Sequence, residues 1–432
     1  MRRFIAAALL SLIPATFAHA AAPGDETHRT YDAAQSGLLQ IRSLIEASSR
    51  QSSIGSGFQV DDAGLAMTNY HVISEHALEP DTYRLEYMRT DGSRGALRLV
   101  AVDVAHDLAV VRLDKPAAST LPLDSGAHEL RQGQRLYAMG NPLDLGFTIV
   151  EGTYNGIAER SYSERFHFTG AINPGMSGGP AVDEAGRVVG VNVAKRLDGE
   201  LVSFLVPVRF GSELLQRARS APLADVHEAK AEIGRQLAQR QTALYRQLIE
   251  RGFRANTAGR YQAPASEAPW FQCWANTNAA EVPKPRARVD STQCNAAIDL
   301  FIADDLQTGG VRLRHEHLRA LKLNDFQFAN FLSDHYTPLQ GSLFWDASRK
   351  ATPRCRDEFV APEAGSDRPP LRVAWCSRAY RDFDGLYDVT VSAVTQDDAQ
   401  EALVARLSME SVPYDLALRL ARDYLGAISW AK

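Results

Sequence analysis

The sequence has no cysteine before Cys273, and its four cysteines include no Cys-x-x-Cys pair, which disfavours a zinc site built on thiolates. After residue 20 no apolar run approaches the length of a transmembrane span, so no integral membrane segment is predicted there. Internal repeats and low-complexity tracts are also missing. The formal net charge of −5 gives no electrostatic basis for binding nucleic acid or anionic membranes. We therefore expect no metal, no cofactor and no nucleic-acid partner.

The first 20 residues have the pattern of a signal peptide. Arg2 and Arg3 precede a short apolar stretch, and Ala18-His19-Ala20 is typical of a cleavage site. The sequence thus predicts an exported protein, with a periplasmic location favoured and full secretion as the alternative. If cleavage fails, the same segment becomes an N-terminal tether. The remaining length and the 45% hydrophobic content are enough for two or three folded units.

The cysteines lie in two equally spaced pairs in the last third of the chain. In an exported protein this spacing favours two disulfides, Cys273 with Cys294 and Cys355 with Cys376. Four cysteines still permit three connectivities.

One serine lies inside a glycine-rich turn, in the stretch Gly170–Pro180 (GAINPGMSGGP). Glycine there allows a turn that aims successive backbone N–H groups at one point, since a Cβ atom would obstruct those conformations. Ser177 is therefore a candidate nucleophile, and the N–H groups of Gly175 and Ser177 are the expected oxyanion-hole donors.

A serine nucleophile needs a base and a group that orients the base. His71 follows a short apolar run, and Asp107 opens a branched apolar run that reads as a buried strand. The chain order His71, Asp107, Ser177 is the order of the triad in trypsin-like barrels. In that scheme His71 accepts the serine proton and later passes it to the leaving amine, while Asp107 fixes the imidazole tautomer.

Each of these residues also has an ordinary structural interpretation. A serine between glycines commonly belongs to an ordinary turn, and a histidine is commonly a structural or solvated side chain. An aspartate before an apolar run is often a cap of the following element. Their order and local sequences together favour the triad. We exclude the neighbours His76, His106 and Asp103, because alternation along an extended segment points His106 away from Asp107.

Several short blocks of the sequence resemble the HtrA/DegP-type trypsin-like serine proteases over about residues 40–215. The blocks are Gly55–Phe58, Thr68–Val72, Asp107–Val110, Gly140–Pro142 and Asn173–Pro180. The resemblance implies a mostly β, chymotrypsin-like double β-barrel with the triad between the barrels. It also implies that Gly186–Asn192 lines the substrate cleft and that Phe204–Val208 is the last strand of the second barrel. We find no carboxylate-binding loop of a PDZ domain, which such relatives often carry.

The resemblance further implies a substrate pocket with Ala171 at its floor and with Val191 and Val193 beside it. An apolar floor supplies no counter-charge for a buried lysine or arginine. Cleavage after small or medium aliphatic residues is therefore expected.

Residues 223–253 have the pattern of a helix, with Ile233, Leu237, Leu244 and Leu248 on one face and Gly252 at its end. We expect a connector that docks its apolar stripe on one domain, with an oligomer contact as the alternative.

Residues 260–432 read as a separate, mixed α/β accessory domain. Period-two residues around Asp384-Gly385 predict a β-hairpin. One helix is predicted through Leu318, Leu321, Phe328 and Leu332, and another after Pro413.

The favoured function is a serine endopeptidase, its protease domain over residues 30–218, that hydrolyses unfolded or exposed polypeptide substrates through an acyl-enzyme. The alternative is a weakly active or latent protease fold that acts mainly as a chaperone-like or partner-binding module. An esterase is less favoured because the blocks lack the chain order of an α/β-hydrolase. Oligomerisation stays open.

Overall fold

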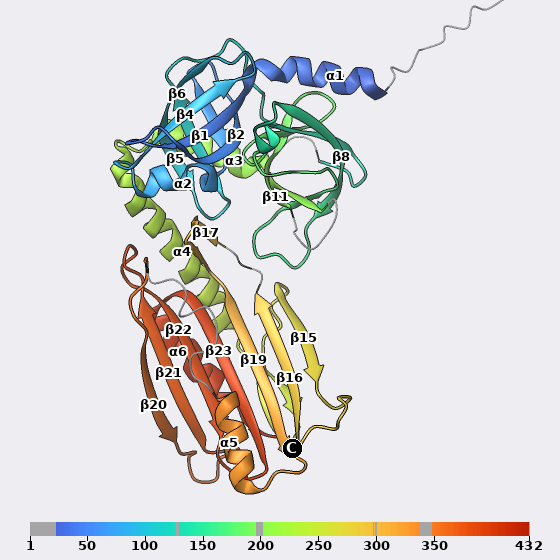
Figure 1. Cartoon of the computed structure of the whole chain (residues 1–432), viewed down its shortest axis with the longest axis vertical. Coiled ribbons are helices and arrows are strands. Elements are labelled where there is room, and N and C mark those ends of the chain that lie inside the picture. The colour runs from blue at the N-terminus through green and yellow to red at the C-terminus, as the bar shows by residue number, and fades with distance from the viewer. Residues whose placement is uncertain are drawn as a thin grey trace, which may run out of the picture.

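The computed structural model describes residues 23–126, 129–195, 202–296, 298, 300–336 and 348–431. The predicted signal peptide lies outside the described residues. Helix α1 (Pro23–Ala34) leads into two closed six-stranded barrels, and a long helix connects them to a large sheet at the other end of the molecule (Figure 1). Within the described part of the chain, no helix combines the length and apolar content needed to cross a bilayer.

The first barrel has the strand order β1-β2-β3-β6-β5-β4. Its strand β6 shows why the apolar run after Asp107 is continuous. Ala109 and Val111 pack inside this barrel, whereas Leu108 and Val110 pack into a core shared with the second barrel. Both faces of the strand are thus buried, and alternation disappears. The strands are β1 (Leu38–Ile45), β2 (Gln51–Gln59), β3 (Leu65–Thr68), β4 (Tyr83–Arg89), β5 (Arg94–Asp103) and β6 (Leu108–Leu113).

The second barrel has the order β10-β11-β12-β9-β8-β7. Tyr137, Met139 and Val206 contribute to the shared core, and helix α3 (Val208–Ser220) packs Leu214 against it. This arrangement confirms the predicted mostly β, chymotrypsin-like double barrel. The strands are β7 (Arg135–Gly140), β8 (Thr148–Ile157), β9 (Phe166–Phe168), β10 (Pro180–Val182), β11 (Val188–Lys195) and β12 (Ser203–Pro207).

Helix α4 (Ala229–Arg251) ends at Gly252, whose φ of 66° is the left-handed conformation that glycine adopts without strain. Ile233 and Leu237 pack in the hydrophobic cluster of the first barrel, whereas Leu244 and Leu248 pack in the core of the C-terminal domain. The expectation that the apolar stripe docks on one domain is therefore wrong. The helix is long enough for its two halves to enter two different cores.

The C-terminal domain is built on a seven-stranded antiparallel sheet of order β15-β16-β19-β23-β22-β21-β20. Helices α4 and α6 (Tyr414–Gly426) share a core with one face of the sheet, and α5 (Asp325–His335) packs on the other (Figure 1). The large strands are β15 (Phe271–Thr277), β16 (Ala287–Ala296), β19 (Val311–Ala320), β20 (Arg354–Val360), β21 (Leu371–Ala379), β22 (Leu386–Thr395) and β23 (Glu401–Pro413). The remaining strands are β13 (Arg254–Ala258), β14 (Tyr261–Ala265) and β24 (Ser429–Trp430) in one small sheet, and β17 (Leu300–Ala303) with β18 (Leu306–Thr308) in a hairpin.

In this domain the predicted hairpin is confirmed, whereas one predicted helix is partly wrong. Strands β21 and β22 pair as the predicted hairpin. The helix predicted through Leu318 and Leu321 is wrong in its first half, because Leu318 lies in strand β19. Helix α5 begins later, where Asn324 and Gln327 form a capping box.

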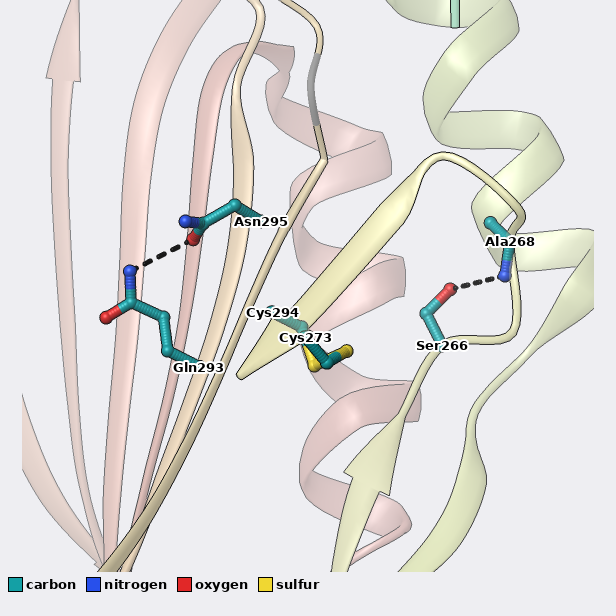
Figure 2. Close-up of a disulfide and its surroundings, with 6 residues drawn as sticks. All are labelled: Ser266, Ala268, Cys273, Gln293, Cys294 and Asn295. Carbon is teal, nitrogen blue, oxygen red and sulfur yellow. Dashed lines mark hydrogen bonds between the residues drawn. A yellow bond between two sulfur atoms is a disulfide. The ribbon is translucent and has the colours of Figure 1, made fainter. Parts of the chain in front are cut away.

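Both predicted disulfides are present. Cys273 lies opposite Cys294 in the β15–β16 register, and Cys355 lies opposite Cys376 in the β20–β21 register. Each bond therefore joins one edge strand of the large sheet to its inner neighbour; Figure 2 shows the first of them.

Candidate active site

His71 and Asp107 form a close pair at the end of the first barrel. His71 Nδ1 lies 2.7 Å from Asp107 Oδ2, and the backbone N–H of His71 donates to Oδ1 at 2.9 Å. An ionised carboxylate only accepts hydrogen bonds, so Nδ1 carries the imidazole proton. The neutral ring then keeps a lone pair on Nε2, the atom that a general base uses.

Asp107 also holds the first turn of helix α2 (Tyr70–Leu78), which presents His71. Its carbonyl accepts from the Asn69 side chain at 2.8 Å and from the Tyr70 N–H at 3.2 Å. Its carboxylate accepts from the His71 N–H, so Asp107 takes the place of a local N-cap. A φ of 60° lets one residue present both groups to the helix end, and aspartate tolerates this conformation better than most residues. The helix terminus is thereby fixed to the strand that follows Asp107.

The surroundings shift the titration of His71. Burial alone would lower its pKa, but the charge and the hydrogen bond of Asp107 outweigh it, and Asp304 adds to them. The pKa of His71 is therefore raised above its ordinary value. The side chain keeps 28% of its surface exposed, so the ring remains accessible to a reacting group.

Ser177 lies in a turn between β9 and β10 that packs on the first barrel. Its carbonyl accepts from the Ser56 N–H at 2.7 Å. Gly178 has a φ of 85°, and a Cβ added there would lie 2.3 Å from the Ser56 carbonyl and 2.8 Å from the Asn69 nitrogen. The turn thus lies against the start of α2. Ser177 Oγ donates to the Val193 carbonyl at 3.3 Å, and it makes no hydrogen bond to His71 within the described residues.

The loop before Ser177 is pinned through its carbonyl groups. The Pro174 carbonyl accepts from the Leu143 N–H at 2.9 Å, and the Gly175 carbonyl accepts from Ser56 Oγ at 2.7 Å. In a trans peptide the N–H points opposite to the carbonyl, so the Gly175 N–H points away from Leu143. Among the described residues, neither this N–H nor that of Ser177 has an acceptor. Two donors beside the Ser177 hydroxyl are thus free.

The predicted pocket residues differ in exposure. Ala171 and Val193 are partly exposed, whereas the Val191 side chain is fully buried in the shared core. The assignment of a substrate pocket to these residues stays a prediction.

The histidines that we excluded have partners elsewhere. His106 Nδ1 lies 3.1 Å from Asp103, and the His106 ring stacks on Phe210. His76 Nδ1 donates to the Tyr83 carbonyl at 2.6 Å. Among the described residues, no group of three or more His, Cys, Asp or Glu side chains is arranged to hold a metal ion.

Sequence reasoning missed residues that support this site from a distance. Ser56 lies within a matched block, yet nothing in its neighbours indicates that its hydroxyl joins the Gly175 carbonyl to the Asn141 N–H. Phe301 of the C-terminal domain contacts the His71 ring, and Tyr70 of α2 donates a hydrogen bond to the Ile302 carbonyl of that domain. No local pattern connects such positions.

Residues 55–191 match the trypsin-like peptidase domain family. Protease Do-like 1 of Arabidopsis thaliana is 34% identical over 149 residues, which cover 32% of this chain and 33% of the relative. A probable periplasmic serine endoprotease, DegP-like, of Brucella suis is 33% identical over 145 residues (32% and 27% covered). The putative serine protease HhoB of Synechocystis is 34% identical over 171 residues (37% and 39% covered).

The chain thus spans about a third of the length of these curated relatives. Among solved structures, the serine endoprotease from Yersinia pestis has a TM-score of 0.39 at 22% identity, covering 45% of this chain and 67% of that chain. Deg5 has a TM-score of 0.39 at 24% identity, covering 45% of this chain and 94% of that chain. The sequence matches and the two closed barrels agree. They establish that the part of the chain around residues 55–191 is similar to the trypsin-like serine proteases of the HtrA/DegP type.

Proposed function

We propose that this protein is a serine endopeptidase with Ser177 as nucleophile, His71 as general base and Asp107 as the group that orients His71. Ser177 Oγ attacks the carbonyl carbon of a peptide bond, and its proton passes to His71 Nε2. His71 returns that proton to the leaving amine as the C–N bond breaks, which leaves an acyl-enzyme. Water then attacks the ester with His71 again as base, and the proton goes back to Ser177.

The observation that supports this mechanism most strongly is the hydrogen bond between His71 Nδ1 and Asp107, because it leaves a basic lone pair on Nε2. For the attack, Ser177 exchanges its hydrogen bond to Val193 for one to His71. Catalytic hydrogen bonds of this kind often form only when substrate is bound.

The free N–H groups of Gly175 and Ser177 are suited to bind the oxyanion of the tetrahedral intermediate. Preorganised donors stabilise the developing charge without rearranging, and loss of one such donor raises the barrier by ~2.7–4 kcal/mol. The bonds from Leu143 and Ser56 hold the loop so that both amides stay available.

Polypeptides are the proposed substrates, cleaved after small or medium aliphatic residues because of Ala171. The two disulfides fit an oxidising compartment, and one similar protein is named periplasmic, so we place the proposed activity on exported proteins in the periplasm. A peptide library dominated by cleavage after arginine or lysine would contradict the pocket assignment.

The test is reaction of the full chain with a fluorophosphonate probe, compared with Ser177→Ala, followed by intact mass and by hydrolysis of an unfolded protein. We expect one adduct on the wild type and none on the variant. Equal labelling of both proteins rules out the proposed nucleophile. If the wild type is not labelled but still binds polypeptides, the partner-binding alternative is supported instead. In that case the hydrogen bond from Ser177 to the Val193 carbonyl would be the permanent state of the serine.

A further inference from the structure

A hairpin of the C-terminal domain packs directly on the helix that carries His71. The hairpin is β17–β18, and Figure 1 shows β17 at the junction between the first barrel and the large sheet. The Ile302 carbonyl accepts from the hydroxyl of Tyr70, a fully buried side chain, at 2.8 Å. Leu300, Ile302, Ala303 and Leu306 belong to the same hydrophobic cluster as Tyr70 and the other buried residues of α2.

The opposite face of the same strand presents Phe301 to the imidazole. The ring centroids of Phe301 and His71 are 5.8 Å apart with an interplanar angle of 69°, an edge contact of the kind that aromatic rings favour. Asp304 follows at the turn of the hairpin, where it is exposed.

Resting on the proposed function, we propose that the β17–β18 hairpin is a positioning element of the active site. Phe301 holds the plane of the His71 ring through the edge contact between the two rings. The bond to Asp107 fixes one edge of the imidazole but still allows the ring to tilt about that bond. The contact with Phe301 restricts this tilt, so Nε2 is kept on the side where Ser177 lies. A misplacement of about 1 Å in such a site can reduce rate by about 10²-fold.

The hairpin is anchored at both ends of α2. Near the start of the helix, the bond from Tyr70 holds Ile302. At its end, Arg349 of the C-terminal domain binds Glu79 at 3.0 Å and the hairpin residue Asp305 at 2.7 Å. The Arg349 side chain is only 16% exposed, so solvent screens these pairs less than ordinary surface pairs. The hairpin and the His71 helix are therefore expected to move as one unit.

The charged groups around His71 come from three elements. Asp107 contacts the ring from the loop before β6, and the charge of Asp304 in the hairpin turn acts on it in the same direction; both favour the imidazolium. Arg165, between β8 and β9, interacts with the charge of Asp107. The charge of Arg349 acts on Tyr70, the residue before His71. Loss of the Asp304 charge should therefore lower the pKa of His71.

The experiment measures the rate of fluorophosphonate labelling of the full chain against pH. Phe301→Ala removes the ring contact, Phe301→Tyr keeps it, and Asp304→Asn removes one exposed charge without changing the size of the side chain. Gln307→Ala, at an exposed position of β18, is the matched hairpin control.

We expect Phe301→Ala to label about tenfold or more slowly than wild type, with Phe301→Tyr and Gln307→Ala near the wild-type rate. Asp304→Asn should move the acid limb of the profile to lower pH, because neutral His71 is the reactive form. The proposal is overturned if Phe301→Ala and Asp304→Asn both keep the labelling rate and the pH profile of the wild type. It is also overturned if Phe301→Ala is labelled faster, because the hairpin would then obstruct the site. If the wild type shows no labelling that depends on Ser177, the proposed function itself has failed.

Discussion

Replacing Asp107 with asparagine tests the proposed tautomer with almost no change in volume. Asp107 Oδ1 accepts from the backbone N–H of His71, and that donor cannot reverse its role. The amide oxygen of asparagine must therefore face this N–H, which turns the amide NH₂ toward Nδ1. His71 then accepts at Nδ1 and carries its proton on Nε2, where no base remains for Ser177.

The same aspartate-to-asparagine change in the trypsin-like template lowers kcat by about 10⁴-fold, ~5 kcal/mol in the barrier. We expect a loss of this size in the labelling rate and in peptide hydrolysis. Thermal unfolding should change little, because the bonds from Asn69 and Tyr70 go to the Asp107 backbone. A labelling rate within tenfold of wild type would refute the assigned roles of His71 and Asp107.

A matched control exists four residues earlier. Asp103 is buried and also pairs with a histidine, His106, and with Arg217 at 3.0 Å. Burial raises the pKa of this carboxyl, but His106 and Arg217 outweigh it and lower the pKa to about 2. Asp103→Asn should therefore reduce stability above the carboxyl's unfolded pKa, with the difference from wild type fading as pH falls toward 2, yet keep the labelling rate. Loss of labelling in a folded Asp103→Asn protein would show that the Asp107 effect is not specific.

Further predictions concern the oxyanion loop, a disulfide and the junction between the domains. Gly175→Ala should lower labelling by about 100-fold or more, since φ is 94° and the new Cβ would lie 2.4 Å from a backbone oxygen; near-normal labelling would contradict the loop assignment. Ser56→Ala should slow labelling by about tenfold by freeing the loop carbonyl, and an unchanged rate would separate this hydroxyl from catalysis. Replacing Cys273 and Cys294 by serine should lower the free energy of unfolding by ~3 kcal/mol in denaturant titrations, and equal midpoints would show that the bond adds no stability. Leu420→Ala, in the C-terminal core, should lower the thermal midpoints of tryptophan fluorescence and of labelling together, since all five tryptophans lie in residues 260–432; a shift in fluorescence alone would show that the domains unfold independently.

The double barrel was predicted through the resemblance to HtrA/DegP-type proteases, and that resemblance rests on short, continuous blocks of sequence. The segment around Ser177 is rich in glycine, which indicates a turn, and the run after Asp107 is apolar and branched, which indicates a buried strand. Hydrophobic spacing distinguishes a helix from a strand less well where the same residues fit both periods. Leu318 fits a helical spacing with Leu321, but it lies in strand β19 on the face opposite Val311 and Leu313, and pairing with β16 and β23 decides the outcome.

The contacts between the domains could not be predicted from the sequence. Helix α4 reads as one apolar stripe, and nothing in that stripe indicates that Leu237 and Leu244 belong to different cores. Phe301 lies 230 positions from His71 along the chain, in a short hairpin with no motif of its own. Such contacts depend on how the domains pack, which no local residue pattern encodes.

The hydrophobic cluster of the first barrel is completed by residues from outside that barrel. Ile233 from α4, Leu300 and Ile302 from the hairpin, and Phe383 from the loop after β21 are all buried in it. Exposing one such side chain costs about 1.5–3 kcal/mol, and a domain as a whole is stable by only about 5–15 kcal/mol. We therefore expect removal of residues 223–432 to unfold the first barrel, whether or not Phe301 positions His71. Inactivity of a truncated protease domain says nothing about how His71 is positioned, and single substitutions in the intact chain are the informative perturbation.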